Sequence, residues 1–492
     1  MGTFETLAFM DAAADTGRLF DQGAWKPARG GTRPVLEPAT GAVLRQAGIA
    51  TAEDMREAIT HATQAQPAWA ALPPRERSAV LLRAAQWLQQ HVEALAQAIA
   101  RETGGVLPKG EREVREAIFL CQLGAGLPVR AQGEVLPSTP GRLSIARRMP
   151  YGVVGVISPF NMPLILGIRS VAPALALGNA VVLKPDPRTP FSGGAIMAEM
   201  FRHAGLPPGV LQVLSGDAES GEALVTDARV PMIAFTGSPA VGRRIGELAG
   251  RHLKKVSLEL GGANNLIILD DADLDAAASA AAFGAWFHQG QICMASNRVL
   301  VHEAVAEAIR QRLVDKARRL PVGDGASGGV ALGPMIDRRQ LERFDAVVRD
   351  TVAAGAVLEA GGTCEGLYYR PTVLSNVQPG MRSFDEEPFG PVVNLVTFRT
   401  DEEAVELANN SHGGLAAGII SRDVARALAI GERIHAGMLH INDQTVSNDY
   451  TNPFGGPGLG GNGSAVGGPA DIDQYTRWQW VTVKSAPPSY PF

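Results

Sequence analysis

Apolar positions recur at helical spacing near the N-terminus. They return every three or four residues from Met55 to Ala62, after a capping sequence that begins at Thr51. They do so again from Val80 to Leu88, after a pair of prolines. This pattern predicts two helices in this part of the chain.

Between residues 150 and 270 the period changes, and short apolar runs alternate with helical stretches. The runs are VVGVISP, AVVLKP, LQVLSG, MIAFTG and KVSLEL. A second region of this kind extends from about 264 to 440, with NLIILDD, RVLVHE, NLVTF, AAGIIS and MLHIND, and with helices expected over 272–289 and 303–319. Near-continuous apolar strands that alternate with helices are typical of parallel sheets covered on both faces. We therefore predict an α/β protein with two parallel-sheet domains in tandem.

The C-terminal segment follows neither pattern. Residues 453–470 are rich in glycine and proline, and they lead into the strand-like sequence WQWVTV at 478–483. Its apolar side chains have no neighbouring helical segment to cover them. We predict an edge strand in a small β arm that pairs with a partner chain.

Composition is that of an ordinary globular protein and narrows the range of partners. Of the 492 residues, 46% are hydrophobic and 19% are charged, and the net charge is −5. Lys and Arg are scattered, which argues against nucleic-acid and anionic-membrane partners. The most apolar stretch, 171–183, contains Pro, Gly and Asn and is too short to cross a bilayer. The first twenty residues lack the basic start of a signal peptide, so we expect a cytoplasmic protein.

The sequence does not indicate a metal site. Three cysteines, Cys121, Cys293 and Cys364, form neither a disulfide framework nor paired metal ligands. No H-E-x-x-H motif occurs, and the nine histidines are dispersed. Two segments, 323–328 and 458–463, match the dinucleotide-binding pattern G-x-G-x-x-G, but neither stands between a strand and a helix, as that pattern requires. We interpret both as loops.

Two polar segments that follow predicted strands contain candidate catalytic and cofactor-binding groups. Asn161 lies between two prolines in SPFNMP, so a stiff loop holds an amide that can donate a hydrogen bond to a developing oxyanion. A turn-forming Asn is the alternative. Gly237 and Ser238 in FTGS open a helix, whose N-terminus and bare backbone suit a diphosphate. Ordinary helix capping by Thr or Ser is the alternative there.

A glutamate and a cysteine complete the candidate catalytic groups. Glu259 ends an apolar strand before two glycines, where apolar surroundings favour the neutral acid and suit a general base near neutral pH. Its carboxylate could instead accept hydrogen bonds from turn amides. A lone cysteine is usually a buried filler, as Cys121 and Cys364 are expected to be. Cys293 differs because it follows Gly-Gln at the end of a helical stretch.

Five segments in order resemble the NAD(P)-dependent aldehyde dehydrogenase superfamily. They are SPFNMP, FTGS, LELGG, GQIC and EEPFGP, and the resemblance extends from about residue 20 to the tail. The family implies two tandem Rossmann-like parallel-sheet domains and a small β oligomerisation arm. On this chain it implies an NAD(P)-binding domain at 1–128 and 150–258, a catalytic domain at 259–452, and an arm at 129–149 and 470–492.

The resemblance also implies a role for each matching residue. Cys293 is the nucleophile, Glu259 is the general base, and Asn161 forms the oxyanion hole with the Cys293 backbone N–H. The aldehyde becomes a thiohemiacetal and then a thioester, which a water activated by Glu259 hydrolyses. A CoA-acylating relative typically lacks this glutamate. The cofactor-binding residues are expected to be Ser158, Pro159, Phe160, Lys184, Gly237, Ser238, Leu260, Glu387 and Phe389.

Other segments resemble the branch that oxidises benzaldehyde, vanillin and salicylaldehyde. They are HINDQTV at 440–446, NPFGG at 452–456, KPDP at 184–187 and the WQW of the tail. We therefore expect an aromatic aldehyde, with an aliphatic aldehyde or a semialdehyde as the alternative. Arg169 stands where many relatives have a bulky aromatic residue, and either faces the pocket or bonds to a neighbouring segment. Half of the apolar residues named in the next sentence could instead belong to the ordinary hydrophobic core. The residues expected to line the pocket are Met162, Leu166, Arg169, Phe287, Ile292, Met294, Thr445 and Phe454, with Phe160 and Trp286 as further candidates.

Two rival classes remain open on the sequence alone. A non-catalytic structural relative would not need Cys293, Glu259 and Asn161 to be intact. A cofactor-free thiol hydrolase would pair Cys293 with a histidine. His288 lies nearby on a predicted helix, but no orienting acid is evident.

The cofactor is expected to be NAD, with NADP also accepted. Many NAD-selective relatives carry a Glu three residues after the lysine of KPDP, where it repels a 2′-phosphate, whereas Pro187 here has no charge. Lys184 and Arg188 add nearby cations, while Asp186 could take the role of the missing Glu. The expected partners are a small-molecule aldehyde and further copies of the chain, in a homodimer or a dimer-of-dimers tetramer.

Overall fold

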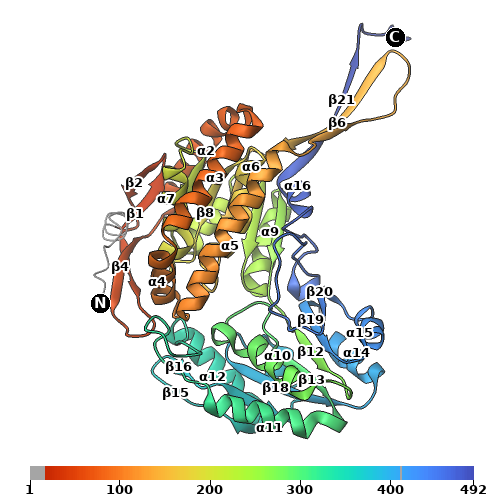
Figure 1. Cartoon of the computed structure of the whole chain (residues 1–492). Helices are drawn as coiled ribbons and strands as arrows, with labels where there is room; N and C mark the ends of the chain where they lie inside the picture. The colour runs from red at the N-terminus through yellow and green to blue at the C-terminus, as the bar shows by residue number, and fades with distance from the viewer. Residues whose placement is uncertain (1–16, 411–412) are drawn as a thin grey trace.

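The chain forms two lobes and one projecting arm (Figure 1). The computed structural model describes residues 17–410 and 413–492, so the expectation about a signal peptide falls mostly on residues outside the described ones. The second lobe, drawn in green to blue, begins at strand β12 (Asn265–Ile268). Among the described residues, no helix has both the length and the apolar composition needed to span a membrane.

The first lobe is built on a seven-stranded sheet. Five consecutive strands, beginning at one edge of the sheet, are parallel and confirm the five apolar runs, while two short N-terminal strands add an antiparallel edge on the other side. The sequence did not indicate this edge, because strands of four residues are too short to show alternation. The order is β11 (Lys255–Glu259), β10 (Met232–Thr236), β7 (Val153–Ile157), β8 (Ala180–Lys184), β9 (Leu211–Val213), β1 (Arg18–Asp21) and β2 (Ala24–Pro27).

Helices cover both faces of this sheet, as expected for parallel strands. Each layer packs on the sheet through its own core of apolar side chains. One layer contains α2 (Ala52–Ala71), α8 (Ala218–Thr226) and α9 (Pro239–Arg251). The other contains α3 (Pro74–Gln90), α5 (Leu107–Gly126), α6 (Pro163–Ala176) and α7 (Ile196–His203).

The N-terminal helices confirm the predicted caps and include one more helix than expected. Thr51 caps α2 through a reciprocal capping box with Asp54. Pro74 begins α3. The chain then breaks at His91, whose φ of −125° and ψ of 15° are not helical, and continues as α4 (Val92–Thr103). Apolar spacing alone does not reveal a break of one residue.

The second lobe has a seven-stranded sheet of its own. All strands are parallel except β14, which pairs antiparallel at one edge. The five predicted runs are confirmed, whereas β14 and β17 were not predicted. The order is β14 (Val357–Ala360), β17 (Thr372–Ser375), β18 (Val392–Phe398), β13 (Arg298–His302), β12, β19 (Gly414–Ile420) and β20 (Ala436–Ile441). The helices around it include α10 (Leu274–Trp286), α11 (Glu303–Arg319), α12 (Arg338–Ala353), α14 (Asp401–Asn409) and α15 (Val424–Gly431).

The helix predicted over 303–319 coincides with α11, but the one predicted over 272–289 is shorter. It is α10, which ends at Trp286, and a tight turn over Phe287–Gly290 follows. Within this turn His288 and Gln289 have φ values of 49° and 56°. Positive φ is uncommon for residues other than glycine and cannot continue a helix. The chain therefore leaves the helix shortly before Cys293.

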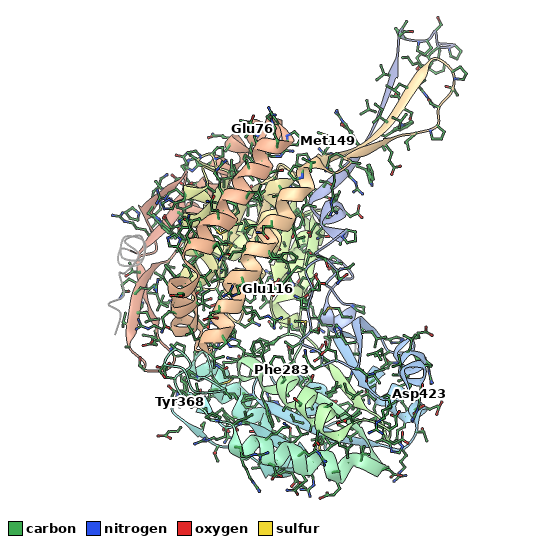
Figure 2. All side chains as sticks on the ribbon, viewed as in Figure 1. Glu76, Glu116, Met149, Phe283, Tyr368 and Asp423 are labelled. Carbon is green, nitrogen blue, oxygen red and sulfur yellow. The ribbon has the colours of Figure 1, made fainter. Side chains whose placement is uncertain are left out.

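The arm is a three-stranded antiparallel sheet that projects from the first lobe (Figure 1). β6 (Arg142–Pro150) lies between β5 (Gly133–Val135) and β21 (Thr476–Lys484), and Met149 marks its base in Figure 2. The tail thus forms an edge strand, as the sequence predicted. Its inner edge pairs within the chain, and its outer edge has no strand partner among the described residues.

A buried carboxylate fixes the beginning of α6, directly after Asn161. Glu113 of α5 accepts the backbone N–H groups of Leu164 and Ile165 at 3.0 and 3.4 Å, and it pairs with Lys109. The first N–H groups of a helix have no partner within the helix, and a carboxylate there satisfies them. The loop that carries Asn161 is therefore anchored to α5 at the point where α6 begins.

Candidate active site

The predicted cofactor residues lie along one edge of the first sheet. β11, β10, β7 and β8 are parallel neighbours, so their carboxyl ends meet at this edge. The Ser158 N–H donates to the Lys184 carbonyl at 3.2 Å, and the Gly237 N–H donates to the Glu259 carbonyl at 3.0 Å. In open α/β sheets, ligands bind in the crevice outside such strand ends. The edge brings together Ser158, Pro159, Lys184, Gly237, Ser238 and Leu260.

The beginning of α9 offers a surface for a diphosphate. Ser238 is the N-cap and accepts the Val241 N–H at 3.5 Å, so the capping interpretation is also correct. A Cβ on Gly242 would come within 2.5 Å of Leu260 Cδ2, so packing requires a bare backbone here. A helix N-terminus with such a backbone presents N–H groups to a phosphate.

Two unpaired oxygens at this edge fit the hydroxyl groups of a dinucleotide. The Ser158 hydroxyl and Glu387 Oε1 are buried, and no described residue forms a hydrogen bond with either atom. The Glu387 carboxylate lies so close to Gly261 that a Cβ there would be 2.2 Å from Oε2. Burial raises the pKa of Glu387 to about 8. Because buried polar atoms without partners are rare, these oxygens indicate a ligand that completes their hydrogen bonding. The residues present therefore fit NAD(P).

Phe160 and Phe389 form an aromatic wall beside this edge. Their ring centroids are 5.9 Å apart at an interplanar angle of 73°. The Arg188 guanidinium stacks on Phe160 at 4.0 Å and donates hydrogen bonds of 2.8–2.9 Å to Asp186 and Asp337. Arg188 and Asp186 thus satisfy each other. These pairs compete with the roles near the adenosine ribose that the sequence suggested for Arg188 and Asp186.

The Cys293 loop is anchored by two asparagines. Asn161 Nδ2 donates to the Gln291 carbonyl at 2.8 Å, and Asn264 Nδ2 donates to the Cys293 carbonyl at 2.7 Å. One amide hydrogen of Asn161 therefore remains available for an oxyanion beside Cys293. Asn264 was not predicted. The clue was its place in an Asn-Asn pair before an apolar strand, where a buried amide needs a specific partner.

Cys293 is the cysteine that lines the cavity at this loop. Burial raises the pKa of its thiol to about 12, Arg169 opposes this effect, and Glu387 and Glu259 add to it. Cys121 is buried inside the helical layer of the first lobe, and burial raises the pKa of its thiol as well. Cys364 is exposed on the short strand β15 (Cys364–Glu365). The expectation that Cys121 is buried is confirmed, whereas the same expectation for Cys364 is wrong, because its short strand lies at the surface.

Glu259 ends β11 with its carboxyl group buried and unpaired. Its side chain is 3% exposed, and within residues 17–410 and 413–492 neither Oε1 nor Oε2 has a hydrogen-bond partner. The alternative role, in which the carboxylate binds turn amides, is therefore not observed. Burial raises the pKa of Glu259 to about 8, and the positive charge of Arg169 partly opposes the shift. A group with this pKa can release and accept a proton near neutral pH.

A narrow cavity of about 40 Å³ opens at Cys293 and Asn161. Phe287 in its wall stacks on Phe283 of α10 at 5.0 Å, and Phe283 is labelled in Figure 2. Thr445 is fully buried behind this wall, and its hydroxyl donates to the Met294 carbonyl at 2.5 Å. Of the predicted pocket residues, Met162, Leu166, Arg169, Phe287, Ile292, Met294 and Phe454 line the cavity, together with Arg112, Ile165, Val446, Asn448 and Tyr450.

His288 does not form a catalytic pair with Cys293. The prediction that it lies on a helix is wrong, since its backbone is left-handed. The ring is buried beside the Asn161 backbone, and burial together with the charge of Lys109 lowers its pKa well below the usual value. No hydrogen bond joins His288 to Cys293 in the part of the chain that the structure describes. A cofactor-free Cys-His hydrolase therefore has no support.

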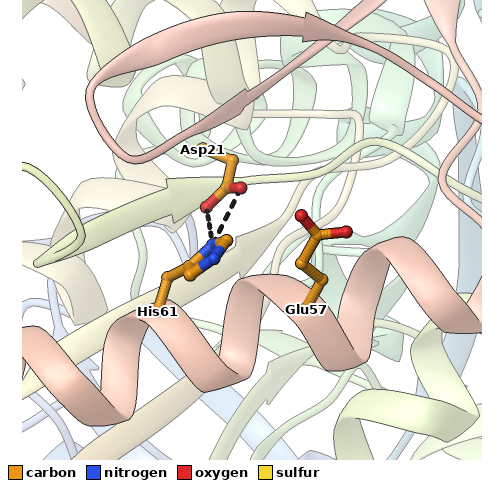
Figure 3. Close-up of side chains that lie close together, drawn as sticks. All are labelled: Asp21, Glu57 and His61. Carbon is orange, nitrogen blue, oxygen red and sulfur yellow. Dashed lines mark hydrogen bonds and ion pairs between the residues drawn. The ribbon is translucent and has the colours of Figure 1, made fainter.

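A second polar cluster, on the first lobe, is satisfied by its own cations. Asp21, Glu57 and His61 lie close enough to hold a metal ion, and His61 points at Asp21 in Figure 3. The oxygens of Asp21 accept hydrogen bonds from His61, Lys26 and Gln212. Glu57 is paired with an arginine. The cluster joins β1 to α2, and no unpaired ligand atom of Asp21 indicates a cation.

Comparison with known proteins agrees with this geometry. The aldehyde dehydrogenase family model matches residues 25–481. A vanillin dehydrogenase from Amycolatopsis sp. is 51% identical over 99% of this chain and 100% of its own length. The NAD(+)-dependent benzaldehyde dehydrogenase from Pseudomonas putida is 47% identical over 97% of this chain and 98% of its own.

Solved structures show the same fold. Betaine aldehyde dehydrogenase from Staphylococcus aureus, in complex with NAD+, has a TM-score of 0.94 at 29% identity and covers 99% of this chain and 98% of its own. PnpE from Pseudomonas sp. WBC-3 has a TM-score of 0.93 at 34% identity, over 97% of this chain and 99% of its own. With the five ordered motifs and the Cys293 site, these likenesses show that the chain belongs to the aldehyde dehydrogenase family.

Proposed function

We propose that this enzyme oxidises aromatic aldehydes to carboxylic acids with NAD(P) through a thioester on Cys293. The observation that carries the proposal is the cavity in which Cys293 and Asn161 meet aromatic and flexible apolar side chains. Phe287 and Phe454 can face a flat ring, and Met162 and Met294 can turn aside to admit it. Relatives of high identity are named for vanillin and benzaldehyde.

The side chains of the site divide the reaction between them. Cys293 adds to the aldehyde carbon, and the Arg169 charge favours its thiolate. The oxyanion that forms lies within reach of the free amide hydrogen of Asn161 and the Cys293 backbone N–H. The bound dinucleotide supplies the acceptor for the departing hydride. Glu259 then takes a proton from water, which attacks the thioester carbonyl, releases the acid and restores the thiol.

The surroundings of Lys184 support use of both dinucleotides. Arg33, on β3 (Thr32–Leu36), donates two hydrogen bonds to Asp217 at 2.8 and 2.7 Å, and the charges of both act on the buried Lys184 ammonium. Arg33, Pro187 and Arg188 line one cavity. We propose that NADP is accepted and that Arg33, instead of Arg188, is the second cation near a 2′-phosphate. Asp217 competes for it, which favours NAD.

The arm supports a dimer. Trp478 and Trp480 on β21 are 50% and 65% exposed, and Leu143 and Val483 are also exposed there. An apolar strand with a free outer edge is a natural contact for a second copy of the chain. We propose that two chains pair through their arms, with a tetramer as a dimer of such dimers. Because catalysis needs a reduced Cys293, we place the enzyme in the cytoplasm.

Replacing the nucleophile should abolish the reaction. In Cys293→Ala, the rate of benzaldehyde oxidation, measured as the rise in NADH absorbance at 340 nm, should fall by about a thousandfold or more, as expected when a covalent nucleophile is lost. Binding of NAD, followed by calorimetry, should be unchanged. Cys364→Ala is the matched control because that thiol is exposed, and it and Cys121→Ala should retain normal kcat. Substantial turnover by Cys293→Ala would refute the mechanism.

Glu259 should control release of the acid. Glu259→Gln should give a burst of NADH in rapid mixing, followed by a steady-state rate lower by about a hundredfold, the range of general base catalysis. In the parent enzyme the carboxyl is largely protonated below its pKa of about 8, so the hydrolytic rate should rise with pH through that value. The rise should vanish in Glu259→Gln. Normal steady-state turnover by this variant would exclude the role.

Cofactor choice should depend on charge near Lys184. In Pro187→Glu, kcat/KM for NADP should fall by about tenfold to a hundredfold because a carboxylate repels the 2′-phosphate. Asp217→Asn should raise kcat/KM for NADP and leave that for NAD nearly unchanged, since Arg33 loses its competing partner. Arg188→Met is the control and should not change the ratio for NADP over NAD more than about threefold. A parent that rejects NADP by more than about a thousandfold would contradict the proposal.

Removing the tail strand should disrupt assembly. A chain that ends at Thr476 keeps the buried Tyr475 but lacks β21 after its first residue, and it should sediment as a monomer or aggregate. A chain that ends at Lys484 keeps β21 and serves as the control, which should sediment like the parent. If the shorter chain forms the same oligomer as the parent, the arm does not build the contact.

A further inference from the structure

Arg169 is a charged side chain buried without a partner. It is 2% exposed, and its Nε, Nη1 and Nη2 atoms have no hydrogen-bond partner among the residues that the structure describes. A guanidinium carries five N–H donors, and burying them unpaired is costly. Most buried polar groups in proteins are satisfied, so an exception on this scale requires an explanation.

The side chain points into the substrate cavity. Met162, Ile165, Leu166 and Arg169 recur at helical spacing at the beginning of α6, and all four line the cavity with Cys293. The Arg169 guanidinium lies over the Phe454 ring, 4.2 Å from its centroid. This contact partly stabilises the cation and fixes its plane, but it uses none of the in-plane N–H donors.

The ionisable groups around Arg169 carry little negative charge at neutral pH, so a further anion can be bound there. The groups whose charges it influences are Glu259 on β11, Cys293, Tyr450, Tyr475 and Asp471, the last on α16 (Ala470–Tyr475). Burial raises the pKa of Glu259 to about 8 and that of Asp471 to about 6, and the tyrosines and the thiol are also shifted toward their neutral forms. At neutral pH, Asp471 is therefore the one ionised group of this set, and its carboxylate accepts the Gly467 N–H.

We propose that Arg169 binds a phenolic oxygen on the ring of the aldehyde substrate and binds it best as the phenolate. This inference rests on the proposed aromatic aldehyde oxidation and specifies its substrate class. A ring hydroxyl that shares its π system with an aldehyde is more acidic than that of tyrosine, whose pKa is about 10. Charge-assisted hydrogen bonds from a guanidinium would satisfy donors that the free enzyme leaves unpaired. The remaining walls of the cavity are mostly apolar and suit the ring itself.

The test compares substrates that differ in one oxygen. We would measure kcat/KM for benzaldehyde, 4-methoxybenzaldehyde, 4-carboxybenzaldehyde and the 2-, 3- and 4-hydroxybenzaldehydes with the parent, Arg169→Met and Arg169→Lys. At least one hydroxybenzaldehyde should lose about tenfold to a hundredfold in Arg169→Met relative to benzaldehyde, the worth of a hydrogen bond to a charged group. The methoxy compound cannot ionise and should follow benzaldehyde. Arg169→Lys should restore part of the loss.

A pH profile and a control arginine sharpen the result. In the parent, preference for the hydroxybenzaldehyde over its methoxy analogue should increase as the substrate phenol ionises, and this increase should be absent in Arg169→Met. Arg349→Met removes the same charge outside the cavity, where the side chain on α12 is 72% exposed and pairs with Asp345 at 2.9 Å. It should leave the substrate ratio unchanged.

Three outcomes would overturn the inference. An equal loss for benzaldehyde and every hydroxybenzaldehyde would show that Arg169 acts on Cys293 or Glu259 instead of the substrate. A larger loss for 4-carboxybenzaldehyde than for any phenol would assign the guanidinium to a carboxylate. No change in any ratio would remove Arg169 from recognition. Failure of the proposed function is a separate result, because the parent would then not oxidise benzaldehyde at all.

Discussion

Parallel pairing of β7, β8, β10 and β11 aligns their carboxyl ends, and the whole site depends on this alignment. Each strand delivers one polar segment to the same edge, although the segments are far apart in the chain. Backbone hydrogen bonds between neighbouring ends, such as that from Gly237 to Glu259, fix their relative height. The helices that follow add N–H groups at the same edge, and right-handed crossovers leave little freedom in where these helices lie. A shift of one strand would separate the base from the cofactor surface.

The ionisable groups at this edge are buried and poorly solvated. Glu259, Glu387 and Arg169 are buried with atoms that lack hydrogen-bond partners, and the thiol of Cys293 is largely desolvated. Such groups reduce the stability of the free enzyme, since each would be better solvated in the unfolded chain. The surrounding lobes are rich in buried apolar side chains, which offsets that cost. Substrate, cofactor and water then find polar atoms that do not have to give up existing hydrogen bonds.

The sequence predicted the elements of this site better than their connections. Strands such as VVGVI and MIAFT were recognised because buried parallel strands are nearly continuous apolar runs. The roles of Cys293 and Glu259 came from a resemblance to a family, and the structure adds their burial and their neighbours. By contrast, the left-handed turn at His288 was missed because the helical spacing before it gives no sign of where a helix stops. Asn264 was missed because an amide shows its partner only in three dimensions.

Arg169 and Arg188 illustrate the same limit within one residue type. Both are arginines beside an aromatic ring, and the sequence offered each as a possible ligand-binding cation. Asp186 and Asp337 accept three hydrogen bonds from Arg188, which therefore braces the Phe160 wall. Arg169 has a similar ring contact with Phe454, but in the described part of the chain no carboxylate lies within hydrogen-bond distance of it. The charge on the two side chains is equal, and the number of donors left unsatisfied differs. Unsatisfied donors are what a ligand can bind, so partner geometry, and not residue identity, separates a structural arginine from a recognition site.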